Sequence, residues 1–438
     1  MLNNNIIKRL IILLFTIVLT SCGISKSLQH KPIVEGYNDT VSERVVYSDS
    51  LMTIDDNKLT LSKYGHWQLL VKGDPLQRGL ITGSLTQELL QYQDKVFLDK
   101  VTEIVPSKFK QRLLRSFLKW FNRKLYLNVK EEYKTEIYGV SRYASETYNY
   151  IAPKYLRSLY LHGAHDIGHA LQDLALVGCS SFAAWGNKTT DGNLILGRNF
   201  DFYAGDDFAK NKLISFVKPD NGIPFASVSW GGMIGVVSAM NLNGLTVTLN
   251  AGKSDMPLVA KTPISLLARE IIQYASTIEE AINIAKTRNV FVAESIMVGS
   301  AADNKAVLIE VSPNKFGVYD VANTNQLICS NHFQTEAYKE DENNMKHILE
   351  SHSKYRYDKM SQLIDSTTVM TPQAAVNILR NKNGLQNKIK KNKAVESIPP
   401  LKASKLLGVF ISNLCLFIVL FILGYWNPRE LSREARLN

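Results

Sequence analysis

The chain has 438 residues, of which 45% are apolar, 21% charged and 9% aromatic, and this composition excludes a disordered, collagen-like or fibrous protein. The formal charge is +11, but residues 1–21 carry +2 of it, residues 386–438 carry +6, and the long middle part carries only +3. Excess charge in the flanks favours a membrane and argues against a nucleic-acid partner. The cysteines form neither a disulfide framework nor a zinc-ligand spacing, because they are few and scattered: Cys22, Cys179, Cys329 and Cys415.

The N-terminus carries a basic pair, Lys8-Arg9, followed by an apolar run over residues 10–20. This pattern predicts a secretory signal peptide over residues 1–21, and the run is too short to span a bilayer comfortably. The ending Leu19-Thr20-Ser21-Cys22 resembles a bacterial lipobox, in which the chain is cut before the cysteine and its thiol is acylated. We therefore predict lipidation at Cys22, with an ordinary signal peptide as the alternative. Residues 22–60 are polar and aperiodic, which predicts a tether.

Residues 61–178 are predicted to form a mainly helical N-terminal fragment. Gly73-Asp74-Pro75 and Gly79 indicate turns, and apolar residues recur at helical spacing over 85–105. Residues 108–134 form a basic amphipathic stretch with nine Lys or Arg and two Glu. One interpretation is a membrane-facing helix, or a lid for an acidic or amphiphilic substrate. We favour the other, a solvated helix whose apolar face packs in the core.

From residue 179 to residue 385 short β runs dominate, with two helices among them and Thr371-Pro372 opening another. Asn243-Gly244 indicates a hairpin, and Thr277-Ile278-Glu279-Glu280 is typical of a helix capping box. This order predicts an α+β protein with stacked antiparallel sheets covered by helices. The predicted strands are 194–198, 213–217, 225–230, 235–240, 245–250, 295–300, 306–311, 316–321 and 326–331, and the first two helices begin near 263 and 277.

Residues 386–438 form a Lys-rich tail that contains a 21-residue apolar stretch, 406–426. Its length fits a transmembrane helix, and the three arginines that follow fit a cytoplasmic end. Lys402 and Lys405 precede the stretch, so the difference in positive charge between its two ends is small. The alternative is an atypical tail.

The candidate catalytic residues lie close to the start of the predicted β part. If the chain is cut between Gly178 and Cys179, the new N-terminal residue carries a thiol and an α-amine with ordinary pKa values near ~8.5 and ~8. One residue then supplies both the nucleophile and the general base. Arg198 would favour the thiolate, and Asp201 would orient the amine.

Side-chain amides can stabilise the oxyanion that such a nucleophile creates. Asn250 and Asn331 are the candidates for donating hydrogen bonds to it. The alternative for both residues is an asparagine in an ordinary turn.

Several short motifs together resemble the N-terminal nucleophile (Ntn) hydrolases, and most closely the acyl-coenzyme A:6-aminopenicillanic acid acyltransferase-like cysteine family, related to choloylglycine hydrolases. The resemblance runs from about residue 73 to about residue 380. The motifs are Gly178-Cys179-Ser180-Ser181-Phe182, Thr190-Asp191-Gly192-Asn193, Gly197-Arg198-Asn199-Phe200-Asp201, Asn241-Leu242-Asn243-Gly244-Leu245 leading to Leu249-Asn250, Ser330-Asn331-His332-Phe333 and Tyr355-Arg356-Tyr357.

The resemblance implies a four-layer αββα sandwich and no cofactor. It makes Cys179 the nucleophile that self-cleavage after Gly178 exposes, and Arg198 and Asp201 the Arg and Asp of the active-site strand. It makes Asn250 and Asn331 site asparagines, and Arg356 a late arginine that braces the site. Relatives are expected to finish a sheet with strands after the Arg356 region, where this chain has its Lys-rich tail.

The implied function is an autoproteolytically activated amidohydrolase that cleaves the C–N bond of an N-acyl amine, amino acid or small peptide through a Cys179 thioester. Transfer of the acyl group to an amine, a catalytically silent envelope lipoprotein, and a membrane-surface lipid amidase or lipase are the alternatives. With a lipid at Cys22 and a span at 406–426, the protein would be anchored in the cell envelope, facing the periplasm or exterior.

Other residues suggest weaker hypotheses. His165, His169 and Asp173, close to His162, share one face of a predicted helix, as zinc ligands would, but hydrogen-bonded histidines explain them equally and we predict no metal. Cys329 is predicted to be a buried strand residue. The loop Trp230-Gly231-Gly232 either shapes an acyl pocket or is a plain turn.

Overall fold

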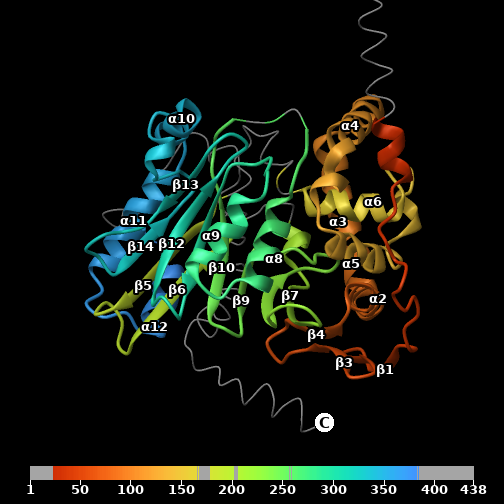
Figure 1. Cartoon of the computed structure of the whole chain (residues 1–438), viewed down its shortest axis with the longest axis horizontal. Helices are drawn as coiled ribbons and strands as arrows, with labels where there is room; N and C mark the ends of the chain where they lie inside the picture. Colours follow the sequence, from red (N-terminus) through yellow and green to blue (C-terminus); the bar gives the residue numbers. More distant parts are fainter. Residues whose placement is uncertain are drawn as a thin grey trace, which may run out of the picture.

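The computed structural model describes residues 23–164, 166, 178–201, 206–255, 257, 259–381 and 383. Figure 1 shows its helices and strands. The α-helices are α2 (Pro75–Leu85), α3 (Gln87–Ile104), α4 (Lys108–Phe121), α5 (Glu131–Ser141), α6 (Lys154–His162), α8 (Ile264–Tyr274), α9 (Ile278–Lys286), α10 (Glu342–Glu350), α11 (Ser353–Asp365) and α12 (Pro372–Leu379). The 3₁₀ helices are η1 (Asn122–Asn128), η2 (Glu146–Tyr148), η3 (Asp206–Ala209) and η4 (Glu336–Tyr338).

The strands form two sheets, one of 11 strands and one of three. In the large sheet β4 and β7 are parallel and every other neighbouring pair is antiparallel. Its order is β1 (Val45–Ser48), β2 (Leu51–Ile54), β3 (Asn57–Leu61), β4 (Trp67–Gly73), β7 (Leu213–Pro219), β8 (Phe225–Ser229), β9 (Ser238–Asn241), β10 (Leu245–Ala251), β11 (Glu294–Ser300), β12 (Lys305–Val311) and β13 (Phe316–Tyr319). The small antiparallel sheet has the order β14 (Gln326–Cys329), β5 (Ser180–Gly186) and β6 (Gly192–Asn199).

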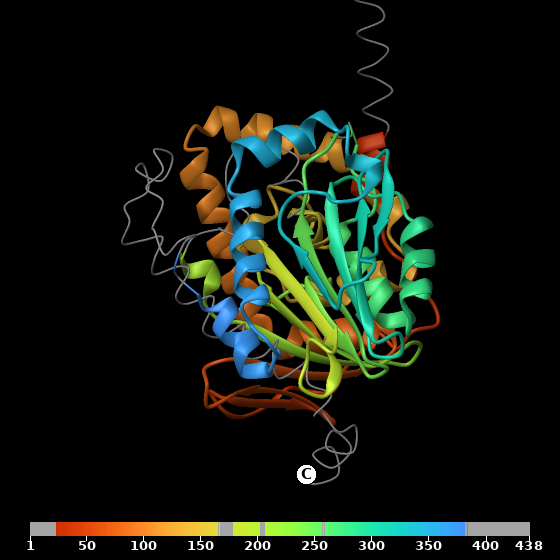
Figure 2. The ribbon, with the colours of Figure 1, turned by 90° about the vertical axis from the view of Figure 1, so that its left-hand side faces the viewer.

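The elements from β5 to α12 stack in four layers (Figure 2). The small sheet lies on the large one, where β5 contacts β10 and β12 and β6 contacts β11. Helices α8 and α9 cover the far face of the large sheet, and α11 and α12 cover the small sheet. Strands β8, β10 and β11 are buried along their whole length, as strands between two covering layers must be. The predicted αββα sandwich is confirmed.

A second core lies among the N-terminal helices α3–α6. Beside it, α2 and α5 cross at very close range. Gly79 and Gly139 permit this approach, because a Cβ on Gly79 would lie 2.2 Å from the carbonyl oxygen of Glu136. The prediction of a turn at Gly79 is therefore wrong. Asp74 instead caps α2, accepting a hydrogen bond from the Gln77 amide, and Pro75 opens the helix.

The predicted tether is wrong over residues 45–60. These residues form β1, β2 and most of β3, which extend the large sheet, and β4 follows within the fragment predicted to be mainly helical. Their sequences, VVYS in β1 and LMTI in β2, do not alternate between apolar and polar residues, because β1 is exposed along its whole length and β2 is only partly buried.

The predicted signal peptide, Cys22 and the apolar stretch 406–426 lie outside the described residues. Within the described ranges, no helix combines the length and the apolar character needed to cross a bilayer.

Candidate active site

Cys179 lies directly before β5, at the start of the small sheet. The β5–β6 register pairs Ser181 with Arg198, so β6 brings this arginine to the cysteine. Arg198 Nη2 lies 3.7 Å from Cys179 Sγ. Both side chains are fully buried, and the contact is the one expected from the sequence.

The guanidinium of Arg198 is held by the large sheet. Its Nη1 donates to the Val237 carbonyl at 2.8 Å and to Ser238 Oγ at 2.5 Å, and its Nη2 also donates to the Leu249 carbonyl. The Phe200 ring lies 4.4 Å from its central carbon. A permanent positive charge is thereby fixed beside the sulfur.

Asp201 follows β6 and faces the peptide bond predicted to be cut. The Gly178 amide donates to the Asp201 carbonyl at 3.0 Å, and a Cβ on Gly178 would lie 3.7 Å from Asp201 Oδ2. Burial raises the pKa of the Asp201 carboxyl to about 6, against the opposing charges of Arg356 and Arg198. Asp201 can therefore exchange a proton near neutral pH.

The Cys179 thiol is held in its protonated form in the uncut chain. Burial raises the pKa of the thiol, and the nearby Arg198 charge lowers it by less. A buried sulfur of this kind needs a base, or the opening of its surroundings, before it can attack.

Asn250 lies on β10 and faces the small sheet. Ser181 Oγ donates to its Oδ1 at 3.0 Å, which fixes the amide so that Nδ2 is the donor end. Nδ2 is buried and has no hydrogen-bond partner among the described residues. A buried amide donor without a partner is uncommon, and here it can serve an oxyanion formed near Cys179.

Arg356, on α11, ties the late part of the chain to the cysteine. Its Nη1 donates to the Cys179 carbonyl and, at 2.8 Å, to Ser180 Oγ, while its Nη2 donates to Asn331 Oδ1 at 2.6 Å. Asn331 Nδ2 donates to the Ala251 carbonyl at 2.7 Å, next to Asn250. Asn331 thus links Arg356 to β10, and its amide has less donor capacity left than that of Asn250.

The sequence analysis missed three residues that belong to this cluster. Ser181 orients Asn250, and Ser353 Oγ accepts a hydrogen bond from the Asn331 backbone amide at 2.8 Å. Glu294 opens β11 with its side chain fully buried and neither carboxylate oxygen bonded within the described structure. Burial and the nearby Asp166 raise the pKa of Glu294 well above its ordinary value, and Arg198 opposes them. Serine gives no sequence signal, but an acidic residue opening an apolar strand could have drawn attention to Glu294.

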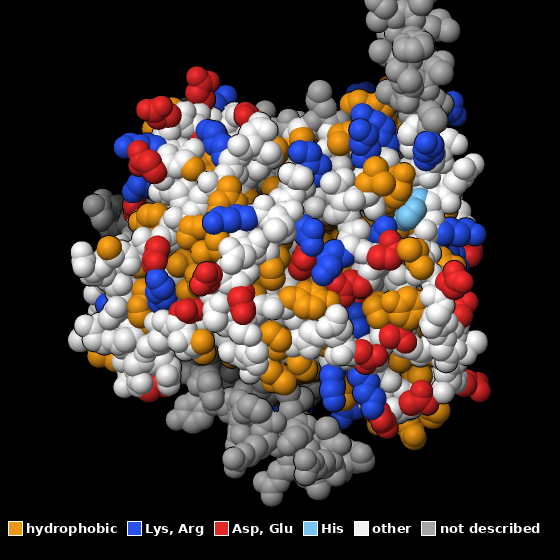
Figure 3. Space-filling view, in the orientation of Figure 1, with side chains coloured by type: hydrophobic (Ala, Val, Ile, Leu, Met, Phe, Trp, Pro, Cys, Tyr) orange, Lys and Arg blue, Asp and Glu red, His pale blue; other side chains and the backbone are white. Residues whose placement is uncertain are grey.

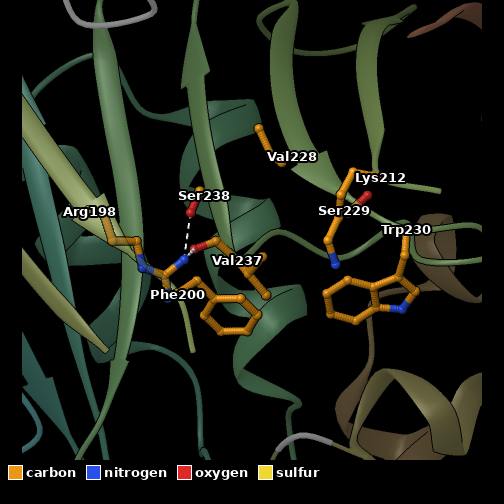
Figure 4. A pocket seen from close by; sticks show the side chains of 8 residues that line it. All are labelled: Arg198, Phe200, Lys212, Val228, Ser229, Trp230, Val237 and Ser238. Atoms are coloured by element: carbon orange, nitrogen blue, oxygen red, sulfur yellow. Dashed lines mark hydrogen bonds between the residues drawn. The ribbon is translucent and has the colours of Figure 1, made fainter. Parts of the chain in front are cut away.

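A small pocket, partly open to solvent, adjoins the cluster (Figure 4). Phe200, Val228, Trp230 and Val237 form much of its wall. Figure 4 shows the Lys212 side chain pointing toward the Trp230 ring. Burial lowers the pKa of Lys212 to about 8. The complete lining is Arg198, Phe200, Lys212, Val228, Ser229, Trp230, Val237 and Ser238.

The remaining candidates have structural contacts. His162 Nδ1 lies 2.8 Å from the Ser158 carbonyl, and its Nε2 accepts from the Ile234 amide at 3.1 Å, so this histidine is neutral and fully used. Cys329 is buried in β14, as predicted. His165, His169 and Asp173 lie outside the described residues. In the part of the chain that the structure describes, no three His, Cys, Asp or Glu side chains are grouped as metal ligands.

Comparison with known proteins finds one matching family model, which covers part of the chain. Residues 187–398 match the family model described as acyl-coenzyme A:6-aminopenicillanic acid acyl-transferase, which confirms the family resemblance for that part of the chain. The match begins after Cys179 and includes the positions of Arg198, Asp201, Asn250, Asn331 and Arg356.

Two curated proteins are similar over a shorter stretch. An uncharacterised protein of Archaeoglobus fulgidus is 32% identical over 153 residues, which are 34% of this chain and 26% of that protein. Protein dcd1B of Dictyostelium discoideum is 26% identical over 155 residues, which are 35% of this chain and 31% of that protein. The matches thus span about a quarter to a third of these relatives' own length.

Two solved structures are distantly similar. The Caenorhabditis elegans ortholog of N-acylethanolamine-hydrolyzing acid amidase has a TM-score of 0.38 at 19% identity, over 47% of this chain and 86% of that one. A mutant form of conjugated bile acid hydrolase from Clostridium perfringens has a TM-score of 0.32 at 14% identity, over 46% and 78% of the two chains. Scores this low carry no argument about the site.

Proposed function

We propose that this chain, which over residues 187–398 belongs to the acyl-transferase family named above, is a self-processing cysteine amidohydrolase. Its substrate class is a small N-acyl amine, N-acyl amino acid or peptide with a linear C–N amide bond. The observation that carries the proposal is the convergence of four distant segments on Cys179. They supply Arg198 from β6, Asn250 from β10, Asn331 from the segment after β14 and Arg356 from α11.

Activation begins at the Gly178–Cys179 peptide bond. The Cys179 sulfur attacks the Gly178 carbonyl carbon, the C–N bond breaks, and the thiol proton passes to the departing Cys179 nitrogen. Asp201, with a pKa of about 6 and beside Gly178, can relay that proton. Water then hydrolyses the resulting thioester, which leaves a carboxylate on Gly178 and a free thiol and α-amine on Cys179.

Turnover repeats this chemistry on an external amide. The α-amine takes the thiol proton, the sulfur attacks the substrate carbonyl carbon, and the oxyanion receives a hydrogen bond from Asn250 Nδ2. The ammonium then gives its proton to the leaving amine, and water releases the acid from the Cys179 thioester. Arg198 favours the thiolate electrostatically throughout.

The acceptor of the acyl group decides between hydrolysis and transfer. Water gives hydrolysis, whereas an amine gives the acyl transfer for which the family is named. We favour hydrolysis because an exported domain, which the predicted signal peptide implies, meets little acyl-coenzyme A.

The pocket supports the substrate class. Its aromatic and aliphatic wall suits an apolar group.

The test is intact mass and N-terminal sequencing of the protein purified from a bacterial envelope. We expect fragments that meet at Gly178 and Cys179, and their loss in Cys179→Ala. Cys329→Ala is the matched control, since it removes the other buried thiol of the described residues, and it should still be cut. The cut protein should then hydrolyse N-acyl amides.

A wild-type chain that remains uncut and whose Cys179 does not react with an N-acyl amide would instead support the silent lipoprotein. The same mass spectrum tests lipidation, because an acylated Cys22 would be the first residue of the mature chain.

A further inference from the structure

Helix α4 lies at the top of the N-terminal helical part in Figure 1, and about half of its residues are exposed. Phe121, at its last position, is its only buried residue. Leu118 and Trp120 are partly buried and pack against the same helical core as Phe121, so one side of α4 does pack in the core, as the favoured interpretation expects. A second apolar row of α4 remains exposed in the described structure, and that row needs another explanation.

The uncovered face carries a stripe of large apolar side chains. Phe109, Leu113 and Phe117 follow one another at intervals of four residues, and their exposed fractions are 68%, 55% and 36%. Single exposed apolar residues are ordinary, but three on one helix face form a contiguous patch. Phe117 stacks on Phe121 with ring centroids 5.7 Å apart, so the stripe is anchored to the core.

The charges beside this stripe are all positive. Helix α4 contains five Lys or Arg and no acidic residue. The nearest acidic side chains along the preceding helix, Asp99 and Glu103, form salt bridges with lysines of α3 itself. Figure 3 shows blue and orange side chains side by side over α4. The five basic residues are Lys108, Lys110, Arg112, Arg115 and Lys119.

We propose that α4 is an interfacial helix that docks on the surface of an anionic lipid bilayer. Aromatic and leucine side chains would enter the boundary between headgroups and acyl chains, and the flanking cations would meet the negatively charged headgroups. The cations alone would also suit a nucleic acid, but the stripe of Phe109, Leu113 and Phe117 has no role on a phosphate backbone. The combination of stripe and cations fits the bilayer.

The start of the described chain lies at the same end of the molecule. A Cβ on Gly23 would lie 3.6 Å from Arg123 Cδ, and the Arg123 guanidinium carbon stacks 4.4 Å from the Trp120 ring of α4. The lipid predicted at Cys22, one residue earlier, would therefore enter the membrane beside α4. The lipid and α4 together would anchor the protein stably, whereas one acyl chain alone gives only marginal membrane binding.

The experiment places an environment-sensitive probe on the stripe. The full-length chain carries Cys22→Ser, Cys179→Ala and Cys415→Ser, and Leu113→Cys is labelled with nitrobenzoxadiazole. The matched control is Tyr64→Cys, which is 62% exposed in the β3–β4 turn, at the opposite end of the molecule in Figures 1 and 2. Vesicles of phosphatidylglycerol with phosphatidylcholine are compared with vesicles of phosphatidylcholine alone.

We expect a blue-shifted emission at position 113, quenched by a bilayer-embedded quencher, in the anionic vesicles and none at position 64. Because the probe reports its own depth, attachment of the chain ends cannot produce this difference. Lys110→Gln with Arg112→Gln should weaken the probe's transfer to the anionic vesicles about 25-fold, from about fivefold per cation, and Lys58→Gln with Lys63→Gln should not.

Three outcomes would overturn the proposal. They are equal signals at positions 113 and 64, no shift at 113 in anionic vesicles, and a shift at 113 that needs only a higher protein concentration, which would indicate a second copy on this face. None of these readouts depends on amide hydrolysis, so they are independent of the proposed activity.

Discussion

The amide of Asn250 is the hydrogen-bond donor on which the proposed chemistry depends most. Its Nδ2 is buried without a partner in the described structure, while its Oδ1 is fixed by Ser181. We predict that Asn250→Ala lowers kcat for an N-acyl amide about 10²- to 10³-fold with little change in KM, as the loss of an oxyanion donor does. Steady-state kinetics of the cut protein measures this.

Ser181→Ala is the matched control, because it removes the group that orients Asn250 and leaves the donor in place. Its effect on kcat should be clearly smaller. Equal losses in both variants, or a change confined to KM, would mean that Asn250 shapes the pocket and does not serve the oxyanion.

Glu294 gives the protein a pH-dependent cost in stability. Its raised pKa means that above the ordinary value of 4.5 the unfolded chain releases a proton that the folded chain keeps, so stability falls as pH rises. Glu294→Gln removes this titration. The free energy of unfolding of the variant relative to wild type should therefore increase by about 1 kcal/mol per pH unit between pH 5 and pH 7, measured by urea denaturation.

Glu310 is the contrasting buried carboxylate. Its oxygens accept from the Gln334 amide at 2.8 Å and from the Thr335 amide and hydroxyl at 2.9 and 2.8 Å. Glu310→Gln turns an N–H group toward these donors and should destabilise by about 1–3 kcal/mol. If Glu294→Gln and Glu310→Gln changed the unfolding free energy in the same direction, the different hydrogen bonding of the two carboxylates would not explain the stability of the two sites.

Sequence motifs located the nucleophile cluster but not the groups that support it. The strand spacing of Arg198 and the short motifs around Asn250, Asn331 and Arg356 were enough to name residues that the fold brings together. Ser181, Ser353 and Glu294 could not be named, because their importance lies in contacts between strands and helices far apart in the chain. Such contacts depend on register and layer packing, which local patterns do not specify.

At the scale of elements, one buried ion cluster joins three helices. Glu136 of α5 accepts from Arg78 of α2 at 2.7 Å and from Arg269 of α8 at 3.2 Å, with all three side chains almost fully buried. Glu136→Ala leaves two buried guanidinium groups without their carboxylate and should cost about 3–5 kcal/mol of unfolding free energy. Urea denaturation measures this loss.

The exposed Lys95–Asp99 pair of α3 supplies the control for that loss. Asp99→Ala should leave the unfolding free energy almost unchanged, because both partners are mostly in solvent. If Glu136→Ala changed the unfolding free energy as little as Asp99→Ala does, Arg78 and Arg269 would have found other partners or water in the variant.

Elements with local signals were predictable, and those without were not. The Asn243-Gly244 hairpin and the capping box at Thr277 appear where the sequence placed them. Strands β1 and β2 escaped because an exposed or half-exposed strand lacks the alternation that marks burial. Helix α4 was recognised as amphipathic, but the sequence could not say whether its apolar face meets protein or solvent, since that depends on how the neighbouring helices pack.

At the scale of the molecule, both sides of the predicted cut contribute to one sheet. Strands β1–β4 precede Gly178 and strands β7–β13 follow it. They meet where β4 pairs with β7 over seven residues, from Trp67 opposite Leu213 to Gly73 opposite Pro219. The order of elements predicted stacked sheets, but not that one sheet would cross the cut, because parallel pairing of such distant strands leaves no local signal.

This shared sheet predicts that self-cleavage does not release the N-terminal fragment. Separating the fragments would expose the backbone groups of β4 and β7 and break the Glu136–Arg269 ion pair, both of which are buried in the intact fold. Size-exclusion chromatography with light scattering should therefore give cut wild-type protein the same mass as uncut Cys179→Ala, while denaturing electrophoresis separates two fragments. A small fragment eluting on its own under native conditions would contradict the prediction. In that case cleavage would have to open the large sheet between β4 and β7, and the cut protein, unlike Cys179→Ala, would expose two unpaired strand edges and aggregate.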